Sequence, residues 1–282
     1  MKLILLDSLS LPGNPAKPNE DAFGHASNAA VVMDGATGLG ESLMSGKSDA
    51  AWLAQFGARR LMAYLRDGAS GGEAVTSALF DAQTSFEALR RRDPKETWEK
   101  PFASMMLIAA NAHGFDAFAY GDCAALVVRP DASVEVIGEA FEKRALEASR
   151  VTKLAKAKAM NPAGDINRPE FLDALRRARN YVNTDKGHYL FGPDVVAADH
   201  VQSWPLAAPA GTKILLCSDG FLALASDYKR YSAAQFIAAA QAKGLAALGQ
   251  ELRGIEKDDP EGIAYPRFKT SDDATAVLLE LV

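Results

Sequence analysis

The stretch Ala29-Ala30-Val31-Val32-Met33-Asp34-Gly35 is a run of five apolar residues that ends in a carboxylate and a glycine. A short apolar run bounded by turn-forming residues is typical of a buried strand. Gly38 and Gly40 follow closely, so the predicted strand leads into a flexible loop. A carboxylate beside a buried strand costs free energy unless another group compensates it. Asp34 is therefore the first candidate for a functional residue.

Acidic residues recur at the ends of other apolar segments, at Glu20-Asp21, Asp122, Asp219 and Asp272-Asp273. Taken singly, each of them is explained as a turn former or a helix N-cap. If the strand ends converge, however, the carboxylates repel one another unless a cation lies between them. Mg²⁺ and Mn²⁺ prefer such oxygen ligands, and no His or Cys pair has the spacing that a softer metal needs.

The order of the predicted elements indicates an α+β fold. Strands come in runs and helices come in runs, which argues against a regular parallel βαβ alternation. The expected helices are Asp49–Leu65, Gly72–Arg91 and Ser232–Arg253, and residues 140–190 are rich in helix formers. The expected strands are Leu3–Leu6, Ala29–Met33, Phe102–Ala110, Phe115–Tyr120, Ala124–Val128, Ser133–Ile137, Val195–Val201, Lys213–Cys217 and Ala274–Leu281.

Composition excludes several classes of protein. The chain has 282 residues and a net charge of −5, which is the wrong sign for a dominant nucleic-acid footprint. No apolar run reaches the roughly 18 residues that a membrane span needs, and Asp7 interrupts the apolar start. Two cysteines, Cys123 and Cys217, exclude a disulfide framework. We expect a cytoplasmic protein with one domain over residues 1–282, bound to neither nucleic acid nor membrane.

Five short motifs occur in the order and approximate spacing of a known family. The chain resembles the metal-dependent serine/threonine protein phosphatases of type 2C, in their bacterial, single-domain branch. That resemblance implies a four-layer αββα sandwich, in which helix pairs flank two antiparallel β-sheets. It rests on Asn19-Glu20-Asp21, Met33-Asp34-Gly35, Gly121-Asp122, Ser218-Asp219-Gly220 and Asp272-Asp273-Ala274-Thr275.

The resemblance also implies a role for each matching residue. Asp34 would bridge two Mn²⁺ or Mg²⁺ ions, and the Gly35 carbonyl would bind one of them. Asp219 and Asp272 would complete the protein ligands of the other ion. With Asp34, these two aspartates form the expected catalytic set.

Three further acidic residues have weaker implied roles. Glu20 and Asp21 would act mainly through metal-bound waters. Asp122, together with Asp219, matches the position of a third, weaker metal site in the family.

The sequence departs from the family pattern at four places, one of which is Cys123, where the family has a serine after Gly-Asp. Asp34-Gly35-Ala36-Thr37-Gly38 stands where Asp-Gly-Met-Gly-Gly is usual. The usual Asp-Asn pair is Asp272-Asp273, and register favours Asp272 as the ligand because it places Thr275 where the family has Thr or Ser. The phosphate-holding arginine is missing, and the nearest cation is Lys17. A lysine binds phosphate as a point charge without the bidentate fork, and Lys17 is equally well explained as a solvated loop residue.

The expected function is hydrolysis of phosphoserine and phosphothreonine in proteins, by a water that bridges two Mg²⁺ or Mn²⁺ ions. Two alternatives stay open: a phosphatase of a small phosphorylated metabolite, and a non-catalytic pseudophosphatase that binds a partner. No protein nucleophile is convincing, because Ser218 does not lie in a Gly-x-Ser-x-Gly elbow. Residues 140–200 occupy the place of the family's mobile flap, where we expect substrate choice to be made.

Overall fold

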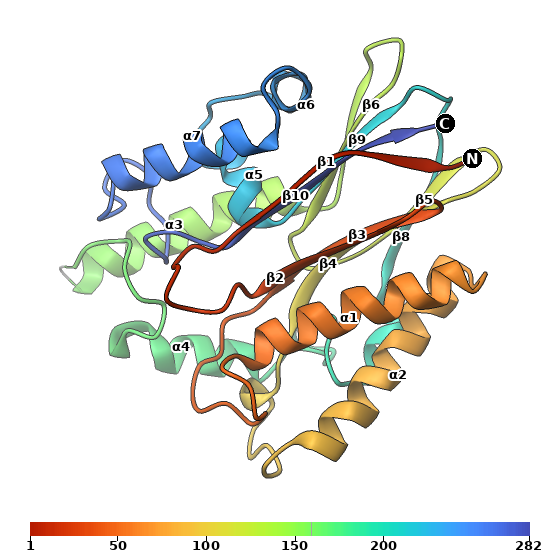
Figure 1. Cartoon of the computed structure of the whole chain (residues 1–282). Helices are drawn as coiled ribbons and strands as arrows, with labels where there is room; N and C mark the ends of the chain where they lie inside the picture. The colour runs from red at the N-terminus through yellow and green to blue at the C-terminus, as the bar shows by residue number, and fades with distance from the viewer. Residues whose placement is uncertain (159) are drawn as a thin grey trace.

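The computed structural model describes residues 1–158 and 160–282. Its two five-stranded antiparallel sheets lie face to face, with helices on both outer faces (Figure 1). One sheet has the strand order β1-β10-β9-β6-β7 and the other β2-β3-β4-β5-β8. The strands are β1 (Leu3–Leu11), β2 (Asp21–Ala26), β3 (Ala29–Gly35), β4 (Ala103–Ala110), β5 (Gly114–Tyr120), β6 (Ala124–Val128), β7 (Val134–Ile137), β8 (Gln202–Ala207), β9 (Lys213–Cys217) and β10 (Ala274–Leu281).

The continuous apolar run of β3 is explained by its burial on both faces. Ala29, Val31 and Met33 pack into the core under the helices α1 and α2. Ala30 and Val32, which alternate with them, pack into the core between the two sheets. Because successive side chains of a strand point to opposite faces, a strand covered on both sides needs apolar residues at every position.

Helices complete the four layers, as the resemblance to the type 2C phosphatases implies. The helices α1 (Asp49–Arg66) and α2 (Gly71–Leu89) cover the sheet that contains β3. The helices α5 (Asp219–Ser226), α6 (Ala233–Lys243) and α7 (Leu245–Asp258) cover the other sheet. Ser48 caps α1 and a capping box of Ser70 and Glu73 starts α2, so the sequence fixes where both helices begin.

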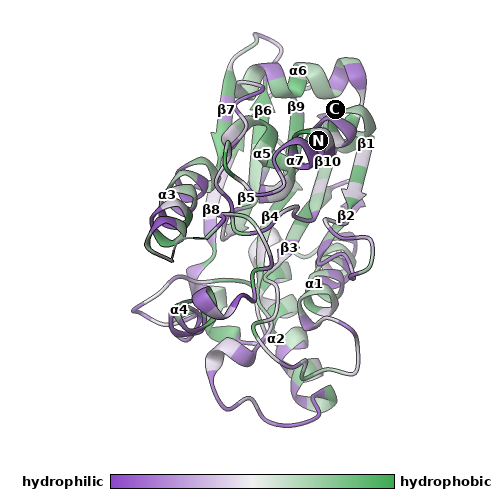
Figure 2. Cartoon of the chain, turned by 90° about the vertical axis from the view of Figure 1, so that its left-hand side faces the viewer, coloured by the Kyte–Doolittle hydropathy of each residue, from purple (hydrophilic) through white to green (hydrophobic). Residues whose placement is uncertain are grey.

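The segment between β7 and β8 lies at one end of the sandwich. It contains α3 (Ala140–Lys158), α4 (Pro169–Arg179) and the 3-10 helix η2 (Val195–His200). Figure 2 shows that α3 and α4 carry hydrophilic surface at this end, whereas the strands behind them are mainly hydrophobic. A short 3-10 helix, η1 (Thr97–Glu99), precedes β4.

Two expectations about individual elements are wrong, and the elements α5, β2 and β8 are not among those expected. Val195–Val201 is not a strand but η2, because Asp194 caps its first turn through Val196 N, and the strand that pairs with β5 starts at Gln202. The expected helix Ser232–Arg253 is two helices, because Gly244 has a φ of 81° that breaks the helix between them.

Cys123 and Cys217 are free and buried, as expected of small core residues. None of the helices in the described part of the chain combines the length and apolarity needed to cross a bilayer.

Candidate active site

Strand pairing brings the acidic motifs to one end of the sandwich. Asp21 on β2 lies directly opposite Asp34 on β3. In the other sheet, β9 ends next to the start of β10, where Ser218 N donates to Thr275 O at 2.9 Å. Asp219 and Asp272 flank this contact, and both exert electrostatic repulsion on Asp34. Four carboxylates that are distant in the sequence therefore share one site.

Burial and mutual repulsion destabilise the charged form of these carboxylates. Desolvation raises the pKa of Asp34 well above its ordinary value, and repulsion from Asp21, Asp219 and Asp272 raises it further. Desolvation likewise raises the pKa of Asp21, and repulsion from Asp272, Asp273 and Asp219 raises it further. A folded protein tolerates such a cluster when a bound cation compensates it.

Three carboxylate oxygens of the site are buried and have no hydrogen-bond partner among the described residues: both of Asp21 and Oδ1 of Asp219. Asp21 is 4% exposed and Asp219 is 8% exposed, so bulk water does not solvate them freely. Buried polar atoms in native proteins almost always have a partner. Anionic oxygens that have none fit a hard divalent cation, so the donor set suits Mn²⁺ or Mg²⁺.

Two protein cations lie beside the carboxylates, one paired with Asp219 and the other with Asp272. Arg144 Nη1 lies 2.8 Å from Asp219 Oδ2, and Lys269 Nζ lies 2.5 Å from Asp272 Oδ1. In the parts of the chain that are described, no three His, Cys, Asp or Glu side chains converge as a preformed metal cage. Burial alone would lower the pKa of Lys269, but attraction to Asp272 and Asp34 outweighs it and raises that pKa.

Asp272 and Asp273 have different surroundings. Asp273 accepts from two backbone amides, Gly13 N at 2.7 Å and Glu20 N at 2.6 Å, so both of its oxygens fasten the loop before β2. The carboxylate of Asp272 pairs with Lys269 and also accepts from the backbone N of Asp273. Of the two, only Asp272 acts on both Asp21 and Asp34, which agrees with the register argument for Asp272.

Glu20 fastens the glycine-rich loop that follows β3. Its Oε2 accepts from Thr37 Oγ1 and its Oε1 from Ser48 Oγ, each at 2.5 Å. Arg179 Nη1 of α4 donates to Thr37 O at 2.7 Å, and Arg176 donates twice to Leu39 O. The backbone beside Asp34 is therefore held by a carboxylate on one side and by one turn of α4 on the other.

Two glycines allow backbone segments to approach each other at the site. A Cβ on Gly35 would lie 2.6 Å from Glu20 O, and a Cβ on Gly220 would lie 2.1 Å from Asp273 O. Both distances are far below van der Waals contact with backbone atoms that cannot yield easily. The glycines after Asp34 and Asp219 are therefore required by packing, and each lets its aspartate approach the neighbouring motif.

We expect Gly220→Ala to destabilise the protein and to displace Asp219 from Asp272. Overpacking of this kind costs about 1–3 kcal/mol, and thermal unfolding followed by circular dichroism measures it. Gly254→Ala in α7 is the matched control, because a Cβ there meets nothing within 4 Å. Replacing a helical glycine with alanine gains about 0.5–1 kcal/mol, so equal melting temperatures for the two variants would contradict this account.

Asp122 and Lys17 lie at the periphery of the site. Asp122 follows β5 in the turn to β6, and its Oδ1 accepts from Ser104 Oγ at 2.5 Å. The side chain of Lys17 is 61% exposed, and its Nζ pairs with Asp165 at 3.6 Å. The structure therefore does not bring Lys17 into contact with the carboxylate cluster.

Sequence reasoning missed Arg144, Lys269, Arg176 and Arg179, all of which contact the site. The two arginines of α4 belong to a basic run that resembles a solvated helix face. Lys269 stands three residues before Asp272, and that spacing is the one signal that could have indicated it. Arg144 has no comparable signal, because its contacts depend on how α3 packs against α5.

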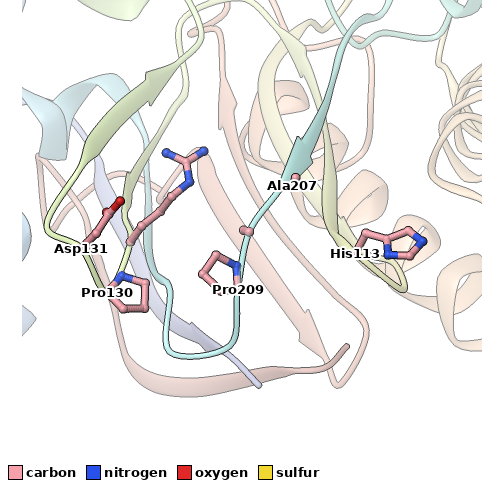
Figure 3. A pocket seen from close by; sticks show the side chains of 7 residues that line it. His113, Pro130, Asp131, Ala207 and Pro209 are labelled. Carbon is pink, nitrogen blue, oxygen red and sulfur yellow. The ribbon is translucent and has the colours of Figure 1, made fainter.

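Two hollows differ in their relation to the carboxylates. One of about 160 Å³ is lined by Glu20, residues 36–42, residues 47–50 and residues 98–101. The other, of about 480 Å³, lies among the strand connections at the opposite end of the sandwich, between Pro130, Pro209 and His113 (Figure 3). Its guanidinium, Arg129, pairs with Glu135. The first hollow alone adjoins a candidate site residue.

Comparison with known proteins agrees with this arrangement. A family model described as protein phosphatase 2C matches residues 15–253. The chain belongs to the protein phosphatase 2C family. Members of this family are serine/threonine protein phosphatases, so the chain is a phosphoric monoester hydrolase. No curated protein matches the sequence significantly.

Solved phosphatase structures share the fold of this type 2C phosphatase at low sequence identity. The serine/threonine phosphatase PstP/Ppp of Mycobacterium tuberculosis has a TM-score of 0.60 and 16% identity, over 100% of this chain and 99% of that one. MsPP of Mycobacterium smegmatis, in complex with cacodylate, has a TM-score of 0.57 and 15% identity, over 99% of each chain. The catalytic domain of PstP in complex with two manganese ions has a TM-score of 0.55 and 18% identity, over 100% and 99%.

Proposed function

We propose that this phosphatase hydrolyses phosphoserine and phosphothreonine in proteins, with two Mn²⁺ or Mg²⁺ ions held by Asp34, Asp219, Asp272 and the Gly35 carbonyl. The observation that carries the proposal is the set of buried, unpartnered oxygens on Asp21 and Asp219. The solved relative with two manganese ions supports the choice of metal.

The chain's own residues prepare the site for a dianionic phosphate ester. Asp34 lies opposite Asp21 on its own sheet and is repelled by Asp219 of the other sheet, so its carboxylate would help to hold the ions. The carbonyl of Gly35, which directly follows Asp34, would supply a neutral oxygen ligand. When bound, paired divalent ions acidify and orient the attacking water and screen the phosphoryl oxygens.

Asp21 departs from its expected role in this proposal. It is among the most buried polar side chains, and neither of its oxygens has a hydrogen-bond partner. We therefore assign Asp21 a direct contact with an ion rather than a contact through water. Glu20 keeps an outer role, because hydroxyl groups already occupy both of its oxygens.

Lys17 remains the proposed contact for the substrate phosphate. Its pairing with Asp165 is long and exposed, and surface pairs of this kind contribute about 0–1 kcal/mol. Turning the ammonium toward an anionic ligand therefore costs little. The role at a third ion that the resemblance implies for Asp122 stays a prediction from the sequence, as does a cytoplasmic location.

A protein substrate is favoured over a small metabolite because the solved relatives are described as serine/threonine protein phosphatases. A phosphorylated side chain on a protein surface needs no enclosure, since the rest of its polypeptide lies outside.

The test offers the manganese-loaded protein a phosphothreonine peptide, p-nitrophenyl phosphate and a panel of phosphorylated metabolites, each with and without EDTA. We expect metal-dependent release of phosphate from the peptide. Hydrolysis of metabolites but not of the peptide would indicate the metabolite alternative. Peptide binding without any hydrolysis would indicate a pseudophosphatase.

A further inference from the structure

A buried guanidinium from the segment between β7 and β8 reaches the carboxylate cluster. Arg144 lies on α3 and is 7% exposed. Its Nη1 donates to Asp219 Oδ2 at 2.8 Å. Its Nε and Nη2 form a fork on the two oxygens of Asp227, each at 3.1 Å. Because Asp227 is the C-cap of α5 and Asp219 lies in its first turn, Arg144 fastens both ends of that helix.

Arg144 leaves Asp219 with one free oxygen. Oδ2 is occupied by the guanidinium, whereas Oδ1 is buried and has no partner. Asp219 is expected to serve both the binuclear centre and the third site that it shares with Asp122. A third ion would have to share this one free oxygen with the binuclear centre or displace Arg144 from Oδ2.

The Asp122 side of the third site is also next to a protein cation. Lys143, the neighbour of Arg144 on α3, donates from Nζ to Gly121 O at 2.7 Å. Asp122 itself accepts from Ser104 Oγ. A divalent ion between Asp122 and Asp219 would therefore lie beside two positive side chains, and it would be repelled by both.

The charges at the site also favour two bound ions over three. The four carboxylates of the proposed centre carry four negative charges, whereas a pair of divalent cations together with Lys269, which pairs with Asp272, carries five positive charges. These four carboxylates are those of Asp21, Asp34, Asp219 and Asp272. Arg144 is compensated separately by Asp227, so it is not a replacement for either ion of that pair.

We propose that Arg144 stands in place of the third ion of the type 2C family, so that this enzyme takes two divalent cations and positions Asp219 with its own guanidinium. The inference rests on the proposed function of the site. Unlike a weakly bound ion, a guanidinium does not dissociate, so α3 supplies this charge at any manganese concentration.

The test counts manganese ions per chain by equilibrium dialysis and elemental analysis at millimolar Mn²⁺. We expect about two ions for the wild type and about three for Arg144→Met, which keeps the bulk of the side chain and removes its charge. Arg144→Lys keeps the charge and should bind the same number as the wild type. Arg150→Met is the matched control, because Arg150 is exposed on the same helix.

Either of two results would overturn the role of Arg144: a third ion on the active wild type, or an unchanged ion count in folded Arg144→Met. Circular dichroism establishes whether the variant folds, and if it does not, the wild-type count and Arg144→Lys decide the question. A wild type that binds no manganese and hydrolyses no phosphate ester would instead overturn the proposed function itself.

Discussion

Replacing Asp34 with asparagine should abolish turnover and, in metal-free protein, raise the melting temperature. Asp34→Asn removes the bridging charge, so we expect activity on a phosphothreonine peptide to fall at least about a hundredfold, the upper range for loss of an outer-shell partner. The same change removes a charge that desolvation and the repulsion from Asp21 make costly in the folded state. Melting followed in EDTA and in Mn²⁺ measures both effects.

The pH dependence of this effect has a definite sign. The pKa of Asp34 is raised in the folded, metal-free protein, so that state binds its proton more tightly than the unfolded chain does. The free energy of unfolding therefore falls as pH rises from the ordinary carboxylate pKa, 3.8, through the raised one. Asp34→Asn should weaken this decline, and the gain in melting temperature should be larger at pH 7 than at pH 4.

Asp93→Asn serves as the control for Asp34→Asn. The Asp93 side chain is 84% exposed, and within the described part of the chain its one ion pair is with Arg90 at the surface. We expect its activity and its melting temperature to stay close to those of the wild type. Near-normal turnover in Asp34→Asn, with an undiminished stabilisation by Mn²⁺, would contradict the assignment of Asp34.

Asp272→Ala should impair metal binding, whereas Asp273→Ala should impair stability. Asp272→Ala removes a proposed ligand, so manganese affinity and turnover should fall at least about a hundredfold. Asp273→Ala leaves Gly13 N and Glu20 N without their acceptors. Hydrogen bonds to charged groups contribute about 1.5–3 kcal/mol each, so Asp273→Ala should unfold several degrees earlier yet still bind manganese.

Asp273→Asn provides an intermediate case, because an amide keeps one acceptor oxygen for the two backbone donors. Its loss of stability should be smaller than that of Asp273→Ala. Isothermal titration with Mn²⁺ and thermal melting separate the two effects. If Asp273→Ala lost manganese while Asp272→Ala retained it, the two assignments would have to be exchanged.

The sequence predicts most of the architecture because its signals are local. The run Ala29–Met33 is apolar at every position, and burial on both faces of β3 explains why. The helix α5 has no such signal, since it is only eight residues long and is buried throughout, without a polar face. Val195–Val201 misled for a related reason: its β-branched residues favour a strand, but the cap at Asp194 fixes a 3-10 turn.

The candidate site likewise contains residues that a local sequence signal predicts and residues that only the folded chain reveals. Its acidic residues stand at strand ends in short motifs, so their positions can be read along the chain. The cations that contact them cannot, because Arg144 meets Asp219 across 75 residues and only after α3 packs beside α5 (Figure 1). Lys17, which sequence position favoured, has its ammonium beside Asp165 instead.

The hydrogen bonds from α4 to the loop after β3 also affect how readily a protease cuts that loop. Arg176 and Arg179 bind the carbonyls of Leu39 and Thr37, while Lys47, further along the same loop, is exposed. A protease needs a locally unfolded stretch to cut, and this loop has one only after α4 releases it. The rate of trypsin cleavage at Lys47 would therefore report how often α4 detaches from this loop.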